Sequence, residues 1–175
     1  MKYLPNILTI ARIVLAVCFV FLYLDNYIIA ATVIFFIASI TDTIDGWLAR
    51  KFNAVSTWGA LYDPLADKAL TISAFICFAV SGIAELWMVI IIILRDIITT
   101  IIRSTSFIDK HIPTSKSAKF KTFLQMTIIA VILILLCLGR TDIVYSDIVY
   151  YAMLVLTIIT VWTLVEYIIQ LKKSK

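Results

Sequence analysis

TFLQMTIIAVILILLCL, at residues 122–138, is a run without a single charged side chain. It belongs to an apolar stretch at 120–138, close to the ~20 residues that an α-helix needs to cross ~30 Å of hydrocarbon. Because lipid offers the backbone no water to bind, a chain that crosses it here must do so as a helix. Five more stretches share this character, at residues 7–24, 27–47, 57–80, 83–104 and 143–171.

These stretches predict an all-α integral membrane protein with six transmembrane helices. A five-helix arrangement is the alternative, if the second and third stretches are divided wrongly. The composition agrees, since the 175 residues are 63% apolar and 15% charged, against about 45–50% and about 25% in soluble domains. Together with a mean hydropathy of +1.06, it excludes a water-soluble enzyme, a disordered chain and a disulfide scaffold. We expect one membrane domain, residues 1–175.

Charge is distributed unequally between the two sets of helix ends. The breaks after the first, third and fifth stretches contain the acids Asp25, Glu85, Asp142 and Asp147, and Arg140 is the one base there. By the positive-inside rule, both termini are expected in the cytoplasm. The net charge of +4 is then explained without a nucleic-acid partner. The opposite ends carry Lys2, Arg50, Lys51, Lys110, Lys116, Lys119, Lys121, Lys172, Lys173 and Lys175.

Four carboxylates lie inside the second and third stretches, where lipid would be expected to exclude them. The second stretch leads into TDTIDGWLAR at 41–50, and the third contains GALYDPLADK at 59–68. On a helix, spacings of three, four, seven and eight residues return to the same face. One face therefore carries Asp42, Asp45, Gly46 and Ala49, and the other carries Gly59, Asp63 and Asp67.

Depth brings the four acids into one layer of the membrane. At 1.5 Å per residue, the deepest acid on each helix is roughly 12 Å from the helix's cytoplasmic end. Each ionised carboxylate costs about 2.5–3.5 kcal/mol at such a position, before like charges repel. Either some are protonated or a cation sits between them, and oxygen ligands favour Mg²⁺, Mn²⁺ or Ca²⁺ over zinc. The small residues on these faces allow close helix packing or leave space for a bound group; beside the acids we favour the second interpretation.

The spacing of these residues resembles the signature of the CDP-alcohol phosphatidyltransferase family. The pattern is Asp42-x-x-Asp45-Gly46-x-x-Ala49-Arg50, then eight residues, then Gly59-x-x-x-Asp63-x-x-x-Asp67. Two further strings, PNILTIAR at 5–12 and DPLADK at 63–68, are similar to those of the bacterial members that make phosphatidylglycerophosphate. The resemblance implies transfer of a phosphatidyl group from CDP-diacylglycerol to an alcohol, with release of CMP.

The resemblance also implies roles for individual residues. It assigns Asp42, Asp45 and Asp63 to a centre of two divalent ions, Mg²⁺ or Mn²⁺, with Asp67 as a further ligand and the general base. It implies a homodimer in a bacterial inner membrane, with the active site facing the cytoplasm. The residues that it places around CDP-diacylglycerol are Asn6, Thr9, Asp45, Gly46, Ala49, Arg50 and Gly59.

The identity of the acceptor alcohol has to be inferred from basic side chains outside the signature. Arg95 and Arg103 share one face of the fourth stretch, and Lys119 and Lys121 lie at the start of the fifth. Bases of this kind can simply extend toward the membrane surface, but Arg95 lies about three turns inside its stretch and Asp96 is expected to neutralise part of its charge. A buried cationic cluster favours an acceptor that carries a phosphate. We therefore expect glycerol 3-phosphate, with inositol phosphate or phosphatidylglycerol (the cardiolipin synthase reaction) as alternatives.

A protein of another class, a divalent-cation transporter, also places acids inside a membrane. Two features disfavour it here. The acids cluster in one layer instead of tracing a path across, and no inverted repeat is evident.

Overall fold

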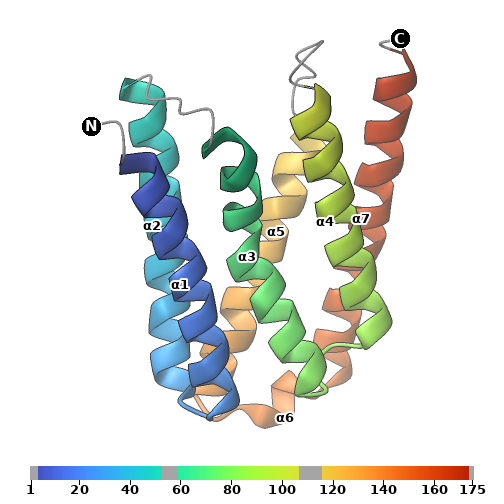
Figure 1. Cartoon of the computed structure of the whole chain (residues 1–175). Helices are drawn as coiled ribbons and strands as arrows, with labels where there is room; N and C mark the ends of the chain where they lie inside the picture. The colour runs from blue at the N-terminus through green and yellow to red at the C-terminus, as the bar shows by residue number, and fades with distance from the viewer. Residues whose placement is uncertain (1–3, 53–58, 107–115, 174–175) are drawn as a thin grey trace. The chain divides into compact units, whose positions relative to one another are not determined.

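The computed structural model describes the backbone of residues 4–52, 59–106 and 116–173, and the side chains of 10–41, 68–102 and 117–171. Within these ranges the chain is entirely helical, apart from short turns (Figure 1). The helices are α1 (Leu4–Leu24), α2 (Ile28–Phe52), α3 (Gly59–Val80), α4 (Leu86–Ser106), α5 (Lys116–Cys137), α6 (Thr141–Val144) and α7 (Asp147–Lys173).

Each of the six predicted apolar stretches corresponds to one long helix, but several boundaries differ. Helix α2 runs five residues past the predicted end, to Phe52, and α5 begins four residues early, at Lys116. Hydropathy marks the part of a helix that is apolar, whereas backbone hydrogen bonding continues into the polar turns beyond it. The basic residues in these extra turns therefore belong to helices and not to loops.

The sixth stretch, predicted to be continuous over 143–171, is divided in two. Gly139 reverses the chain after α5 with a φ of +67°, a conformation that favours glycine. The single turn α6 follows, and the chain then breaks at Tyr145 and Ser146 before α7 begins at Asp147. An acidic residue in the first turn suits the positive end of the helix dipole. The prediction of one uninterrupted helix was wrong at this end, because the polar residues there form a turn of their own.

The chain divides into two compact units, Met1–Cys77 and Phe78–Lys175. In the first unit, α1 packs against α2. Phe19 is fully buried between them, with its ring centroid 5.9 Å from that of Tyr23 and 6.1 Å from that of Phe35. The small, fully buried Ala31 lets the two helices approach closely.

In the second unit, α7 is the element that the others share. It packs against α4, α5 and α6. The buried core between them is apolar and includes Met88, Ile92, Leu133, Met153 and Leu156, each at most 1% exposed. Hydrogen bonds between Arg95, Asp96, Lys121 and Thr163 also join the long helices of this unit.

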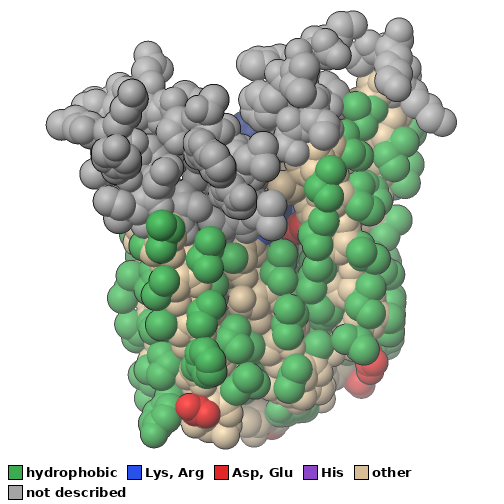
Figure 2. Space-filling view, in the orientation of Figure 1, with side chains coloured by type: hydrophobic (Ala, Val, Ile, Leu, Met, Phe, Trp, Pro, Cys, Tyr) green, Lys and Arg blue, Asp and Glu red, His purple; other side chains and the backbone are tan. Residues whose placement is uncertain are grey.

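The outer faces of the helices are strongly apolar. Ile148 and Trp162 on α7 are each 71% exposed, and Phe123 on α5 is 69% exposed; hydrophobic side chains cover most of the described surface in Figure 2. Among the described residues, α5 and α7 are long and apolar enough to cross a membrane, and only 28% and 33% of their apolar windows are buried. Exposed apolar surface of this extent indicates association with lipid.

Candidate active site

The signature residues lie on helical backbone in both segments. Asp42 and Asp45 fall within α2, and Asp63 and Asp67 fall within α3. Their side chains lie outside the described residues, so the predicted metal layer stays a prediction. Among the side chains that are described, no group of three His, Cys, Asp or Glu could hold a metal ion. The predicted nucleotide-site residues Asn6, Thr9, Gly46, Ala49, Arg50 and Gly59 also lie outside the described side chains.

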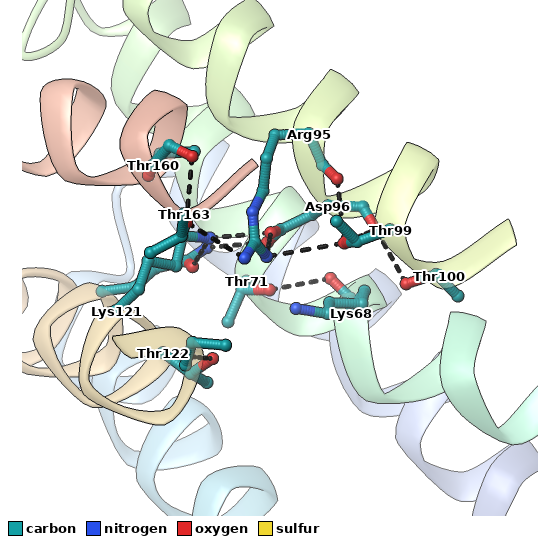
Figure 3. Close-up of polar contacts among 12 residues, drawn as sticks. Lys68, Thr71, Arg95, Asp96, Thr99, Thr100, Lys121, Thr122, Thr160 and Thr163 are labelled. Carbon is teal, nitrogen blue, oxygen red and sulfur yellow. Dashed lines mark hydrogen bonds and ion pairs between the residues drawn. The ribbon is translucent and has the colours of Figure 1, made fainter. Parts of the chain in front are cut away.

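The described part of the second unit contains a buried polar cluster centred on Asp96. This Asp96 cluster consists of Arg95, Asp96 and Thr99 on α4, Lys121 and Gln125 on α5, and Thr163 on α7. Figure 3 shows the α4 residues facing Lys121 and Thr163, which reach the same point from two other helices. Helices α4 and α5 thus meet at the Asp96 carboxylate, and α7 joins them through the hydrogen bond between Arg95 and Thr163.

Asp96 is the common acceptor of the cluster. Its Oδ1 accepts from Arg95 Nη1 at 3.0 Å and from Lys121 Nζ at 2.7 Å. Its Oδ2 accepts from Gln125 Nε2 at 3.4 Å, while the Oε1 of Gln125 accepts from Lys121 Nζ. The two α5 residues of the cluster, Lys121 and Gln125, are therefore both bonded to Asp96 and also to each other.

Because the three charged side chains of the cluster are buried, each of them needs a partner of opposite charge or a hydrogen bond. The exposed fractions are 1% for Asp96, 0% for Lys121 and 6% for Arg95. A charge removed from water to this degree is tolerated only when it is paired and hydrogen-bonded. With two cations and one anion, the three side chains carry a net charge of +1.

The guanidinium of Arg95 is held at both of its terminal nitrogens. Besides its bond to Asp96, Nη1 lies 3.5 Å from Thr99 Oγ1, and Nη2 donates to Thr163 Oγ1 at 3.1 Å. The Nε atom is buried and has no hydrogen-bond partner among the described residues. Arg95 is therefore fixed in orientation, while its Nε donor has no partner among the described residues.

The local sequence explains how each helix supplies its part of the cluster. Helical periodicity places residues four apart on one face, which aligns Thr99 with Arg95 on α4 and Gln125 with Lys121 on α5. On α7 the threonines at 157, 160 and 163 form a polar line within the apolar middle of the helix. Gln125 and Thr163 were missed by sequence reasoning, although these spacings were visible signals.

The four predicted acceptor residues do not all come together. Arg95 and Lys121 meet at Asp96, and the expectation that Asp96 neutralises part of the Arg95 charge is confirmed. Lys119 is exposed, since a residue two positions from Lys121 faces away from it on a helix. Arg103 lies on α4, eight residues beyond Arg95, and its side chain is outside the described residues.

A second polar contact lies between the first turn of α5 and the last turns of α7. Ser117 Oγ donates to the carboxylate of Glu166, whose other oxygen accepts from Gln170 Nε2 at 3.1 Å. These groups are half-buried. The contact connects the start of α5, and with it Lys121 one turn later, to α7.

Comparison with known proteins defines the class to which this fold and site belong. The family model for CDP-alcohol phosphatidyltransferases matches residues 2–164. The match includes both compact units and all residues of the signature. The chain belongs to the CDP-alcohol phosphatidyltransferase family.

Three relatives indicate which members of the family the chain resembles. The chain is 39% identical over 153 residues to the CDP-diacylglycerol–glycerol-3-phosphate 3-phosphatidyltransferase of Rickettsia typhi, covering 85% of each chain. It is 35% identical over 147 residues to the Bacillus subtilis protein of the same name, covering 75% of this chain and 76% of the relative. It is also 37% identical over 126 residues to a cardiolipin synthase (CMP-forming)/mitochondrial hydrolase fusion protein of Schizosaccharomyces pombe, covering 71% of this chain and 20% of the fusion.

Proposed function

We propose that this chain transfers the phosphatidyl group of CDP-diacylglycerol to sn-glycerol 3-phosphate, giving phosphatidylglycerophosphate and CMP. The observation that carries the proposal is the likeness to bacterial enzymes of that name over at least 75% of the chain. Cardiolipin synthesis, with phosphatidylglycerol as the acceptor, is the second candidate, favoured by the likeness to the fission-yeast fusion protein.

The proposed reaction is a displacement at phosphorus. A hydroxyl oxygen of the acceptor bonds to the phosphorus that carries diacylglycerol, and the bond from this phosphorus to the CMP oxygen breaks. The proton of the hydroxyl passes to a base, for which Asp67 is the candidate. A carboxylate near cations is a weak base, but it can accept a proton from an alcohol whose attack is under way.

The residues present fit a divalent-metal centre. The helical backbone of α2 and α3 through the signature supports the one-face spacing of Asp42, Asp45, Asp63 and Asp67, and carboxylates are the ligands that Mg²⁺ and Mn²⁺ prefer. Two such ions, when bound, would neutralise the charge that develops on the pyrophosphate. Arg50 is proposed to bind the same pyrophosphate, beside the small residues at 46, 49 and 59.

The Asp96 cluster supports an anionic acceptor. Its three charged side chains sum to +1, and the Nε donor of Arg95 has no partner among the described residues. A zwitterion such as serine would gain little from this excess, whereas a phosphate would gain a charge-assisted hydrogen bond. Arg103 and Lys121 are proposed as further acceptor-site residues, and Lys119, on the exposed face of α5, as a residue of that site outside the Asp96 cluster.

The proposed setting is a bacterial inner membrane crossed by six helices, with both termini and the active site on the cytoplasmic side. The charge asymmetry of the helix ends supports this orientation. At the acidic ends, exposed aromatic side chains precede or begin the helices, as Trp87, Tyr150 and Tyr151 do, which is typical of membrane interfaces. A homodimer is proposed on the resemblance.

A CMP-release assay tests the activity directly. Purified protein in detergent is given CDP-diacylglycerol and Mg²⁺ with glycerol 3-phosphate, inositol phosphate, serine or phosphatidylglycerol in separate reactions. Release of CMP with glycerol 3-phosphate alone is expected. Release with phosphatidylglycerol alone would favour the second candidate, and folded protein that releases none would point to cation transport, which flux of Mn²⁺ into proteoliposomes would then measure.

A further inference from the structure

The hydrogen bonds around Arg95 leave one of its buried nitrogen atoms without a partner among the described residues. A guanidinium has five N–H donors arranged as a rigid planar fork. Asp96 and Thr99 accept from Nη1, and Thr163 accepts from Nη2. Within the described part of the chain, the buried Nε has no partner, although the whole residue is only 6% exposed. An unpaired buried donor is costly enough to require an explanation.

The geometry of arginine indicates what would satisfy this donor. The Nε hydrogen and one Nη2 hydrogen point the same way along one edge of the guanidinium, and this edge matches two oxygens of a phosphate. The Asp96 carboxylate holds the guanidinium from Nη1. Thr163 accepts from Nη2, and the Nε hydrogen stays without a partner among the described residues and is available to a ligand.

Thr163 is suited to hold Nη2 in this way. Its own hydroxyl proton is donated to the carbonyl oxygen of Thr160 at 3.0 Å, so toward Arg95 the hydroxyl oxygen can only accept. The side chain is 3% exposed, and it is the residue of α7 that bonds Arg95 among those described. Thr163 thus fixes the rotation of a guanidinium that belongs to another helix.

We infer that Thr163 is a positioning residue for the acceptor: it orients Arg95 so that the Nε edge binds the acceptor's phosphate. The inference rests on the proposed function for the identity of that phosphate. Thr163 itself touches no substrate in this scheme. Its loss should therefore weaken acceptor binding and leave CDP-diacylglycerol binding unchanged.

Three substitutions on α7 test this inference. Thr163→Val keeps the shape of the side chain and removes the acceptor oxygen, and Thr163→Ser restores that oxygen. The matched control is Thr160→Val, which removes a fully buried hydroxyl whose hydrogen bond, among the described residues, goes to the carbonyl oxygen of Leu156 within α7. All three proteins are assayed for CMP release while glycerol 3-phosphate and CDP-diacylglycerol are varied in turn.

Thr163→Val is expected to raise the KM for glycerol 3-phosphate by roughly three- to ten-fold, the scale of one ordinary hydrogen bond, because Thr163 acts through Arg95 and not on the substrate itself. The KM for CDP-diacylglycerol should stay within two-fold, about the precision of such a comparison. Thr163→Ser should return the acceptor KM to the wild-type value, and Thr160→Val should not change it. A purely structural role for Thr163 would not separate the two substrates in this way.

Other results would overturn the inference. These are equal changes in both KM values, an equal effect of Thr160→Val, or failure of Thr163→Ser to restore the acceptor KM. If wild-type protein uses inositol phosphate instead, the proposed acceptor fails, and the same separation measured with inositol phosphate still supports the role of Thr163. Calorimetric titration of glycerol 3-phosphate into wild-type and Thr163→Val protein tests the inference without turnover, and unchanged affinity or no binding to either would contradict it.

Discussion

Replacing Asp96 by asparagine is expected to destabilise the protein more than any other single change of charge in the described part of the second unit. Asp96 accepts from two cations at 3.0 and 2.7 Å, and all three charged groups are at least 94% buried. Asparagine keeps the shape of the side chain but removes its charge. The summed charge of the cluster then rises from +1 to +2 in a site that water barely reaches.

The size of the effect follows from the burial of the pair. Removing one partner of a buried ion pair costs about 3–5 kcal/mol, because the other charge stays buried without compensation. For a chain of this length, such a loss lowers the unfolding midpoint by about 10 °C. Adding Lys121→Met removes the second buried charge, so the double variant should be less destabilised than the sum of the single variants by about 1–3 kcal/mol.

Thermal unfolding in detergent measures these midpoints. Cys77 is 1% exposed, so its reaction with a thiol-reactive dye reports loss of packing. The matched control is Asp142→Asn, which removes a surface carboxylate that pairs with Arg140 at 3.2 Å with more than half of each side chain exposed; such pairs contribute about 0–1 kcal/mol. A midpoint for Asp96→Asn within 2 °C of the control, a limit set by that small contribution, or strictly additive single effects would refute the reasoning.

Three substitutions and one metal-removal experiment test other features of the chain. Asp63→Asn should abolish CMP release while the protein still inserts into membranes, and EDTA should do the same reversibly until Mg²⁺ or Mn²⁺ is added; activity at the wild-type level in either case would contradict the metal centre. Lys119→Ala should raise the KM for glycerol 3-phosphate several-fold, as loss of one charge-assisted contact does, and not that for CDP-diacylglycerol; equal changes would remove Lys119 from the acceptor site. The side-chain hydrogen bond from Arg140 holds the pKa of Asp142 below its ordinary value, so Arg140→Ala should raise that pKa, as followed by NMR of the carboxyl carbon. The stability that depends on this lowered pKa is present above the ordinary carboxyl range and is lost as pH falls through the folded-state pKa; an unchanged pKa would refute the assignment.

The helices could be predicted because lipid constrains the sequence so strongly. Each apolar stretch had to be a helix about as long as the bilayer is thick, and one long helix forms at each. The ends could not be placed, because basic residues such as Arg50 and Lys51 continue a helix as readily as they follow one. The turn at Gly139 and the short α6 depend on local backbone conformation, to which hydropathy is insensitive.

The site was predicted unevenly for a related reason. The signature acids are recognisable from spacing along two helices that are consecutive in sequence. The Asp96 cluster instead joins Arg95 to Lys121 and Thr163, which are 26 and 68 residues further along the chain. Which faces of α4, α5 and α7 meet is decided by packing of apolar side chains of similar size. The sequence therefore predicted Arg95, Asp96 and Lys121 but not Gln125 or Thr163.

Lys121 is buried, whereas Lys119, two positions away, is exposed. The relative reactivity of the two amines therefore reports whether the protein is folded. An amine-acylating reagent applied to the native protein should modify Lys119 and spare Lys121, whose Nζ is bonded to Asp96 and Gln125. The two amines lie two residues apart on one helix, and a protease that cleaves at acidic residues leaves them in one peptide. Their labelling ratio, read by mass spectrometry, therefore reports whether α5 remains packed after extraction into a given detergent.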